Sequence, residues 1–259
     1  MPSLFQLRAF ITWWLDAVDG HSLHSPFLFD FYNNIIAATK QGQPNEPIEA
    51  LRRLLLGNNA IVEVEDLGAG SAHNAGAKRR ISDIARTSLS SARFSRIYQR
   101  LIRHYACKTA LELGTSLGVN TLYLADGASH VTTFEGAPAI AQIARENFRI
   151  LNRHNIDVIT GDIESTLPEF LNGAGKVDFV YVDANHRYEP TIRYFDWLKP
   201  HLHNRSVVVL DDIHYHSEME AAWNTIRDDS GVIVSIDLFR AGILFFDPSL
   251  NKQHVVIQV

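Results

Sequence analysis

The second half of the chain alternates short apolar runs with segments of helical periodicity, and this alternation limits the possible folds more than any other feature. The runs lie at residues 110–113, 131–134, 157–160, 179–182 and 207–210. Nearly continuous apolar runs are typical of parallel strands that helices cover on both faces. Two further runs, at 232–236 and 242–246, are too close together for a crossover helix, so we expect an antiparallel pair. The pattern predicts an α/β sandwich of three layers with a mostly parallel sheet.

The first part of the chain has a different pattern. Apolar residues recur at helical spacing over 5–18, 26–36 and 47–56, which predicts three helices. Residues 58–91 follow no clear period and contain DLGAGS at 66–71 and a basic segment (Lys78, Arg79, Arg80 and Arg86). We expect this part to be a loop that becomes ordered when ligand binds. The predicted organisation is a helical cap with a lid loop over 1–90 and a ligand-binding domain over 91–259.

Charge and cysteine content exclude several classes of protein. The chain has 24 Lys and Arg residues against 29 Asp and Glu, a formal net charge of -5, so no overall field attracts nucleic acid or an anionic membrane. The single cysteine, Cys107, excludes an internal disulfide and fits a reducing compartment. The apolar N-terminal segment is too short and too charged for a membrane span. We therefore expect a cytoplasmic protein.

The segment LELGTSLGVNTLYLA, residues 111–125, carries the main chemical signal. The first strand ends near Glu112, Gly114 and Gly118 bracket a turn, and Thr121 lies at the start of a helix. Glycines in such a turn let the backbone approach a ligand. The alternative is a glycine turn that merely joins a strand to a helix.

An acid at the end of the next strand separates these interpretations. Glu135 follows Glu112 by about twenty residues, where a carboxylate can accept hydrogen bonds from both hydroxyls of a nucleotide ribose in a Rossmann-like fold. A nicotinamide-binding fold also has this acid, but its fingerprint is GxGxxG. Here Thr115 and Ser116 occupy the neighbourhood of the middle glycine, which disfavours a nicotinamide oxidoreductase.

LELGTSLGVNTLYLA resembles motif I of class I S-adenosylmethionine-dependent methyltransferases, especially the catechol O-methyltransferase-like group, and the resemblance extends over about 91–259. It implies a seven-stranded sheet whose seventh strand is antiparallel, with Glu112 and Gly114 near the methionine part of the cofactor and Glu135 at its ribose. GDIESTLP, residues 161–168, is similar to the segment that borders adenine. The residues placed at the cofactor are Glu112, Gly114, Thr115, Ser116, Gly118, Thr121, Glu135, Gly136, Asp162, Ile163 and Asp183.

Three aspartates follow the fourth and fifth predicted strands. Asp183 ends one strand, and Asp211 and Asp212 end the other, so all three are expected at the ligand-binding edge of the sheet. Adjacent carboxylates repel each other unless a positive charge lies among them, and Mg²⁺ prefers oxygen ligands. The catechol-type enzymes hold a metal with similar acids, although Asp212 stands where that group has Asn. The alternative is that Asp183 binds only cofactor or acceptor and that one aspartate caps the following helix.

His186 lies three residues after Asp183, where the catechol-type enzymes carry a catalytic lysine. An imidazole that titrates near neutrality can remove the proton of an acceptor hydroxyl. The resemblance therefore makes His186 the expected base, with Asp183 as the second catalytic residue. His214 and His216 are rival bases, and His186 could instead be a surface loop residue.

Together these features predict methyl transfer to the oxygen of a small-molecule acceptor, with S-adenosylmethionine as cofactor, possible assistance by Mg²⁺ and a possible homodimer. An RNA or protein methyltransferase would share the cofactor site, although the net charge disfavours RNA. A non-catalytic cofactor-binding protein of the same fold is the third alternative.

Overall fold

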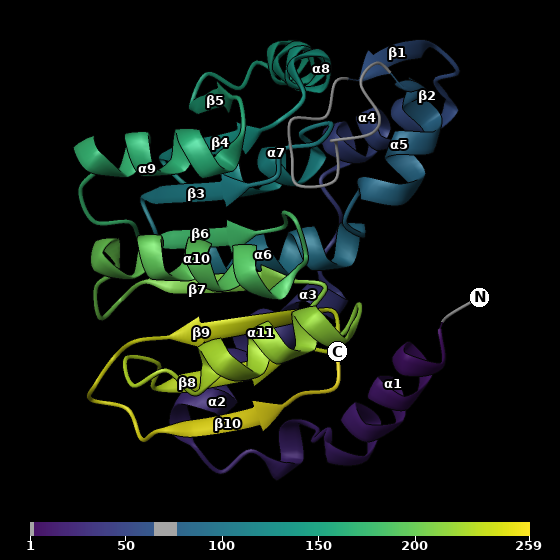
Figure 1. Ribbon diagram of the computed structural model, residues 1–259. Coiled ribbons are helices and arrows are strands. Elements are labelled where there is room, and N and C mark those ends of the chain that lie inside the picture. Colours follow the sequence, from purple (N-terminus) through teal and green to yellow (C-terminus); the bar gives the residue numbers. More distant parts are fainter. Residues whose placement is uncertain (1–2, 65–76) are drawn as a thin grey trace. The chain divides into compact units, whose positions relative to one another are not determined.

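The computed structural model describes residues 3–64 and 77–259, and the chain divides into two compact units (Figure 1). One unit, which contains both ends of the chain, comprises residues 1–37 and 174–259 and is called the terminal unit here. The other comprises residues 38–173 and is called the central unit. Each unit is described by itself.

The terminal unit contains five of the strands that the structure describes. In spatial order these are β6 (Phe179–Val182), β7 (Val207–Asp211), β9 (Ala241–Phe245), β8 (Val234–Asp237) and β10 (Gln253–Val256). β9 runs antiparallel to both of its neighbours, whereas β6 pairs with β7, and β8 with β10, in parallel. The predicted antiparallel pair of runs near the end of the chain is therefore confirmed.

Helices cover both faces of this part of the sheet. The helices of the unit are α1 (Leu4–Asp16), α2 (Pro26–Phe31), α10 (Tyr188–Leu198) and α11 (Ser217–Arg227), with the short 3-10 helices η1 (Gly20–Ser22) and η3 (Lys199–His201) and the π-helix η2 (Tyr32–Ala37). Gly242 and Phe245 point to opposite faces of β9, because successive side chains in a strand alternate. Phe245 contacts the rings of Phe27 and Phe31 at α2, whereas Gly242 lies against Trp223 of α11. Figure 1 shows α10 and α11 side by side.

The central unit contains three parallel strands, β3 (Thr109–Leu113), β4 (His130–Glu135) and β5 (Ile156–Thr160). Its helices after residue 90 are α6 (Ala92–His104), α7 (Val119–Ala125), α8 (Pro138–Ile150) and α9 (Ile163–Gly173). Phe134 of β4 packs on Phe170 of α9. The preceding Thr133 points to the opposite face, where Thr133 and Thr121 of α7 both donate to the carboxylate of Glu112. Helices thus lie on both faces here as well, as the continuous apolar runs predict.

The segment before residue 90 corrects one prediction. After α3 (Ala38–Gln41) and α4 (Glu46–Gly57), β1 (Ile61–Val64) and β2 (Ala77–Arg80) pair antiparallel, and α5 (Ile81–Ser88) follows. The prediction of an irregular loop is therefore wrong for 61–64 and 77–88. Arg86 pairs with Asp83 within α5, at 2.9 Å between Arg86 Nη1 and Asp83 Oδ1. The DLGAGS segment lies outside the described residues, and the lid stays a prediction.

The predicted fold class is confirmed with one difference in strand number. Outside the β1–β2 pair, the described residues form eight strands instead of seven, because β10 was not expected. The predicted N-terminal helices are present with shifted ends: α1 ends at Asp16, and Val18 forms a bridge with Ile257. Among the described helices, none has both the length and the apolar character needed to cross a bilayer.

Candidate active site

The glycine turn of the central unit has a backbone that most residues avoid. Gly114, Ser116 and Gly118 have φ angles of 104°, 48° and 79°. The amides of Gly114 and Thr115 both donate to the Phe134 carbonyl at 3.0 Å, which fixes the turn to β4. A Cβ on Gly118 would lie 2.4 Å from Cε1 of Phe148. Gly118 is thus required by the packing of α8 against the turn as well as by its φ.

Glu112 stabilises the glycine turn through buried hydrogen bonds. Its side chain is fully buried, and its carboxylate accepts hydrogen bonds from Asn120 Nδ2 at 2.9 Å, from Thr133 Oγ1 at 2.7 Å and from Thr121 Oγ1. Thr115 Oγ1 in turn lies 2.6 Å from Thr133 Oγ1. This network ties β3, β4 and the first turn of α7 together.

Glu135 connects the ends of all three strands of the central unit. Its Oε2 accepts from the Ser116 amide at 2.8 Å and its Oε1 from the Ala137 amide at 3.0 Å. Its carbonyl accepts from the Gly161 amide at 2.9 Å, and Asp162 Oδ1 accepts from the Glu164 amide at 3.2 Å. The structure therefore brings together Ser116, Glu135, Gly136 and Asp162, with Ile163 buried at the start of α9.

Ser88 joins this edge, and the sequence analysis missed it. Its Oγ lies 2.6 Å from the Oγ of Ser116. Ser88 is the last residue of α5, which was expected to be loop, so no signal in the sequence connected it with the glycine turn.

The three aspartates of the terminal unit also meet. Tyr181 OH donates to Asp211 Oδ2 at 2.9 Å and to Asp183 Oδ2 at 3.2 Å. Arg240 Nη2 donates to Asp211 Oδ2 at 3.1 Å, and Arg240 Nε lies 3.9 Å from Asp212 Oδ1. Sequence analysis missed both partners. Tyr181 looks like a core residue of a buried strand, and Arg240 lies far along the chain in the turn between β8 and β9.

The cluster holds more negative than positive charge. Burial raises the pKa of Asp211 to about 6, the charge of Asp183 adds to this shift, and Arg240 opposes it. The pKa of Asp212 is also raised, mainly by burial, although Arg240 acts in the opposite direction. Because burial is the main cause of both shifts, the charged forms of these carboxyls are disfavoured, and such a cluster can hold a proton or a cation.

Besides Arg240, His186 is a candidate for a balancing charge within the unit. Its Nε2 lies 3.2 Å from Asp183 Oδ1. Burial acts to lower the pKa of His186, but the hydrogen bond and charge of Asp183 outweigh burial and raise it. One ligand atom each of Asp183, His186 and Asp212 lie within 4.8 Å of one another. This trio has the spacing of metal ligands, whereas Asp211 is held by Tyr181 and Arg240.

The backbone around the cluster is strained. Asn185, His186, Asp212 and Phe239 have φ angles of 62°, 45°, 53° and 67°. The left-handed region costs a residue other than glycine about 1–2 kcal/mol. Such outliers persist where the surrounding structure enforces them, often at functional sites. The observed strain therefore supports a functional role for this edge.

The two rival histidines have structural partners. His214 Nδ1 lies 2.8 Å from Glu220 Oε1, and its Nε2 lies 2.8 Å from Asp237 Oδ2. His216 caps α11, because its Nδ1 accepts from the Met219 amide at 3.3 Å. With both ring nitrogens of His214 facing carboxylates, neither histidine is placed as well as His186 to act as a base.

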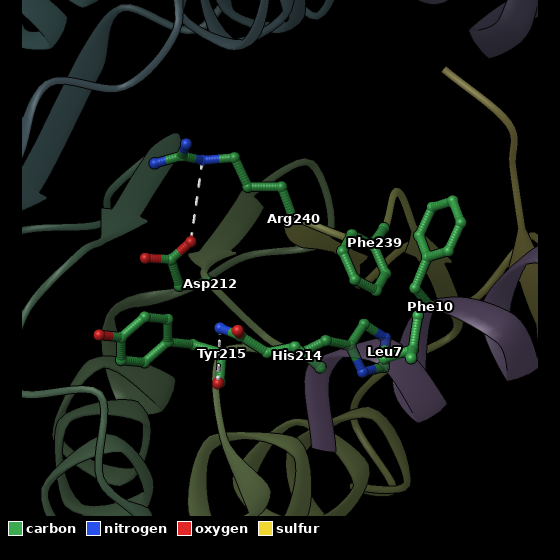
Figure 2. Close-up of a pocket in the computed structure, with 8 residues that line it drawn as sticks. Leu7, Phe10, Asp212, His214, Tyr215, Phe239 and Arg240 are labelled. Atoms are coloured by element: carbon green, nitrogen blue, oxygen red, sulfur yellow. Dashed lines mark hydrogen bonds and ion pairs between the residues drawn. The ribbon is translucent and has the colours of Figure 1, made fainter. Parts of the chain in front are cut away.

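A cavity of about 460 Å³ opens beside the acidic cluster within the terminal unit (Figure 2). Figure 2 shows Asp212 and Arg240 on one side of it and the side chains of Phe10, Leu7 and Phe239 on another. Its lining residues are Gln6, Leu7, Phe10, Asp212, His214, Tyr215, Phe239 and Arg240.

Known proteins share part of the sequence and the fold. Residues 111–213, which include the glycine turn and all three aspartates, match the family model of a methyltransferase domain. The chain has the fold of known O-methyltransferase structures. It is similar over 82% of its length to 95% of an O-methyltransferase from Bacillus cereus in complex with SAH, with a TM-score of 0.61 and 17% identity. It is also similar over 83% of its length to 99% of a putative caffeoyl-CoA O-methyltransferase from Staphylococcus aureus, with a TM-score of 0.60 and 17% identity.

One curated relative matches over a short segment. This is a probable ribosomal RNA small subunit methyltransferase A from Methanothermobacter thermautotrophicus, 41% identical over 61 residues. The match covers 23% of this chain and 21% of the relative, so the chain matches about a fifth of that protein's length.

Proposed function

We propose that the protein transfers the methyl group of S-adenosylmethionine to the oxygen of a small-molecule acceptor. The observation that carries the proposal is the set of groups at the carboxyl ends of the strands: Glu135 beside the glycine turn in the central unit, and Asp183 with His186 in the terminal unit. In open α/β sheets ligands bind at the carboxyl ends of the strands.

One buried polar atom in the central unit supports a bound cofactor independently of the sequence resemblance. Asn120 Oδ1 is buried and has no hydrogen-bond partner among the described residues. It lies beside Glu112 near the glycine turn, where the amino group of a methionine moiety would satisfy it. Glu135 would hold the ribose and Asp162 with Ile163 would border adenine, while Gly114, Thr115, Ser116, Gly118, Thr121 and Gly136 shape the turn around them.

The residues of the terminal unit would prepare the acceptor. S-adenosylmethionine supplies a methyl group bonded to a sulfonium and leaves as S-adenosylhomocysteine. Asp183 orients His186 through the 3.2 Å contact, and His186 accepts the proton of the acceptor hydroxyl. Holding the acceptor oxygen in line with the methyl carbon would provide much of the acceleration.

A divalent cation is the second part of the proposal. Asp183 and Asp212 would hold it, with Asp211 beside them, and the surplus of negative charge described above supports this. When bound, Mg²⁺ would lower the pKa of the acceptor hydroxyl. His186 is the alternative to a cation for balancing the negative charge of the cluster, because a protonated imidazole beside Asp183 would also supply a positive charge.

Calorimetry with S-adenosylmethionine, paired with a turnover assay for S-adenosylhomocysteine, tests the function. We expect binding, and we expect Glu135→Ala to weaken it by about 1.5–3 kcal/mol, because two hydroxyls lose a charged acceptor. Unchanged affinity in Glu135→Ala would contradict the ribose assignment. Binding without turnover on small molecules, RNA or protein acceptors would leave a non-catalytic protein of this fold.

Chelation tests the metal. Activity should disappear in EDTA and return with Mg²⁺, and Asp211→Asn should raise the Mg²⁺ concentration that is required. Full activity in EDTA would remove the cation and leave Asp183 as an acceptor-binding carboxylate. That result would leave the cofactor assignment intact.

The outer face of α1 supports a homodimer. Leu4, Ile11, Trp14 and Leu15 are 49–88% exposed on this helix, whose charged residues are Arg8 and Asp16. Each large side chain has about 200 Å² of surface, of which roughly two thirds is exposed here, so two copies of the face would bury roughly 1,000 Å². This is the lower bound for a specific interface. Sedimentation should give a dimer that Trp14→Glu converts to monomer. A monomeric wild-type protein at micromolar concentration would contradict the homodimer.

A further inference from the structure

The cavity of the terminal unit is walled by apolar side chains that no other described element covers fully. Leu7 and Phe10 of α1 are 50% and 44% exposed. The rings of Phe10 and Phe239 lie 5.3 Å apart in an edge-to-face arrangement, and Trp13 lies behind both. A surface that leaves large apolar side chains half exposed around a hollow is typical of a ligand site.

Phe239 forms part of this wall at a cost to the backbone. Its φ is 67°, in the left-handed region that a bulky residue rarely adopts. The amide of Phe239 donates to Asp237 Oδ1 at 2.7 Å, and that bond holds the turn between β8 and β9. The same turn directs Arg240 toward Asp211. The strained turn therefore places the Phe239 ring in the wall of the cavity and the Arg240 guanidinium in the acidic cluster.

The opposite end of the cavity is polar, but its positive charges are already paired with carboxylates and are not available to bind an anion. Among the described residues that line it, Arg240 and His214 are the basic ones. Arg240 is engaged by Asp211, and His214 lies between Glu220 and Asp237. Asp212 adds a negative charge of its own. Phosphate or carboxylate groups of a ligand would therefore meet net negative charge here.

We propose that this cavity is the acceptor site and that it takes an uncharged, mainly apolar compound with a hydroxyl group. The hydroxyl lies at the Asp212 end, and the apolar body contacts Leu7, Phe10 and Phe239. This rests on the proposed function for the identity of the ligand as acceptor. The charges around the cavity favour such a compound over a coenzyme A thioester or an RNA, because both of those carry phosphates.

Naphthol and naphthyl phosphate are suitable probes, because they share a ring system and differ in charge. Binding of each to the full chain is measured by calorimetry without cofactor. We expect naphthol to bind and naphthyl phosphate to bind about tenfold more weakly or not at all, because the phosphate would meet like charge in a partly desolvated site. Phe10→Ala should weaken naphthol binding about fivefold through the lost ring contact.

The matched control is Phe29→Ala, the same substitution at an exposed phenylalanine of α2 that does not line the cavity. It should leave naphthol binding unchanged. Tighter binding of naphthyl phosphate than of naphthol, no binding of naphthol, or equal effects of Phe10→Ala and Phe29→Ala would each overturn the proposal. These results are distinct from failure of the proposed function, which S-adenosylmethionine binding and turnover measure separately.

Discussion

Gly118 illustrates how one residue of a ligand-binding turn also serves the core. The residue is buried, its φ is 79°, and the ring of Phe148 occupies the space that a side chain would need. Glu112 likewise lies in the interior, where it receives three side-chain hydrogen bonds. Variants of either residue would therefore change the free energy of unfolding as well as ligand affinity.

We predict that Gly118→Ala lowers the free energy of unfolding by about 2–4 kcal/mol, from the left-handed φ and the clash with Phe148 combined. Urea unfolding without ligand measures this. The matched control is Gly57→Ala at the end of α4, where no atom lies within 4 Å of the position of the new Cβ. If both variants lose equal stability, the packing role of Gly118 is wrong.

The role of His186 as a base is tested by the pH dependence of turnover in the His186→Ala variant. We predict that His186→Ala lowers turnover by about 10²–10⁴-fold at neutral pH, because the acceptor hydroxyl loses its base. The deficit should shrink at high pH, where hydroxide replaces the imidazole. Turnover is measured from pH 6 to pH 10 at saturating cofactor. A deficit that stays constant over this range would argue for a structural role of His186 at Asp183.

At the scale of elements, the sequence predicts what depends on local pattern and misses what depends on distant partners. The buried strands β3, β4, β6 and β7 were found from their continuous apolar runs. β10 has the sequence QHVV, is partly exposed and is a strand because it pairs with β8. β2 reads AKRR and is a strand because β1 pairs with it, from Ile61 with Arg80 to Val64 with Ala77. Pairing energy of this kind leaves no periodic trace in a short segment.

Asp229 joins two elements of the terminal unit and offers a test by pH. It follows α11, accepts from Lys199 Nζ of η3 at 2.6 Å and from the Gly231 amide at 2.8 Å. Burial alone would raise the pKa of Asp229, but Lys199 and the Gly231 amide outweigh burial and lower it. A lowered pKa means that the charged form stabilises the folded state above the ordinary pKa, and that this contribution disappears as pH falls through the lowered value.

We predict that Asp229→Asn lowers the free energy of unfolding by about 0.5–1 kcal/mol at pH 7 and that the difference narrows as pH falls below about 4. Urea unfolding at pH 3, 5 and 7 measures it. Asp228→Asn is the control, because that neighbouring side chain is 78% exposed and lies 3.6 Å from Arg227. A difference that grows at low pH would contradict the assignment.

At the scale of the whole molecule, the sequence predicted which strand ends bring acidic side chains together. Asp183, Asp211 and Asp212 were expected together because parallel strands end at one edge, and the structure brings them within contact of Tyr181 and Arg240. The cavity was not predictable, because its walls come from α1, the segment after β7 and the β8–β9 turn. Phe10 of α1 is more than two hundred residues from Asp212 and from Phe239, and no local pattern relates these positions.

The division into two units predicts that cofactor and acceptor functions separate under mutation. Glu135→Ala in the central unit should raise the Kd of S-adenosylhomocysteine about tenfold or more. Asp212→Ala in the terminal unit should leave that Kd nearly unchanged and lower turnover, because Asp212 would contact the cation and the acceptor.

Calorimetry with S-adenosylhomocysteine and turnover at saturating cofactor measure the two effects on the same preparations. Asp212→Asn is the conservative variant, since it keeps an oxygen ligand and asparagine tolerates the left-handed φ of 53° at this position. It should retain more turnover than Asp212→Ala. Equal loss of cofactor affinity in Glu135→Ala and Asp212→Ala would mean that Asp212 contributes to cofactor binding, and the division of labour between the units would then be wrong.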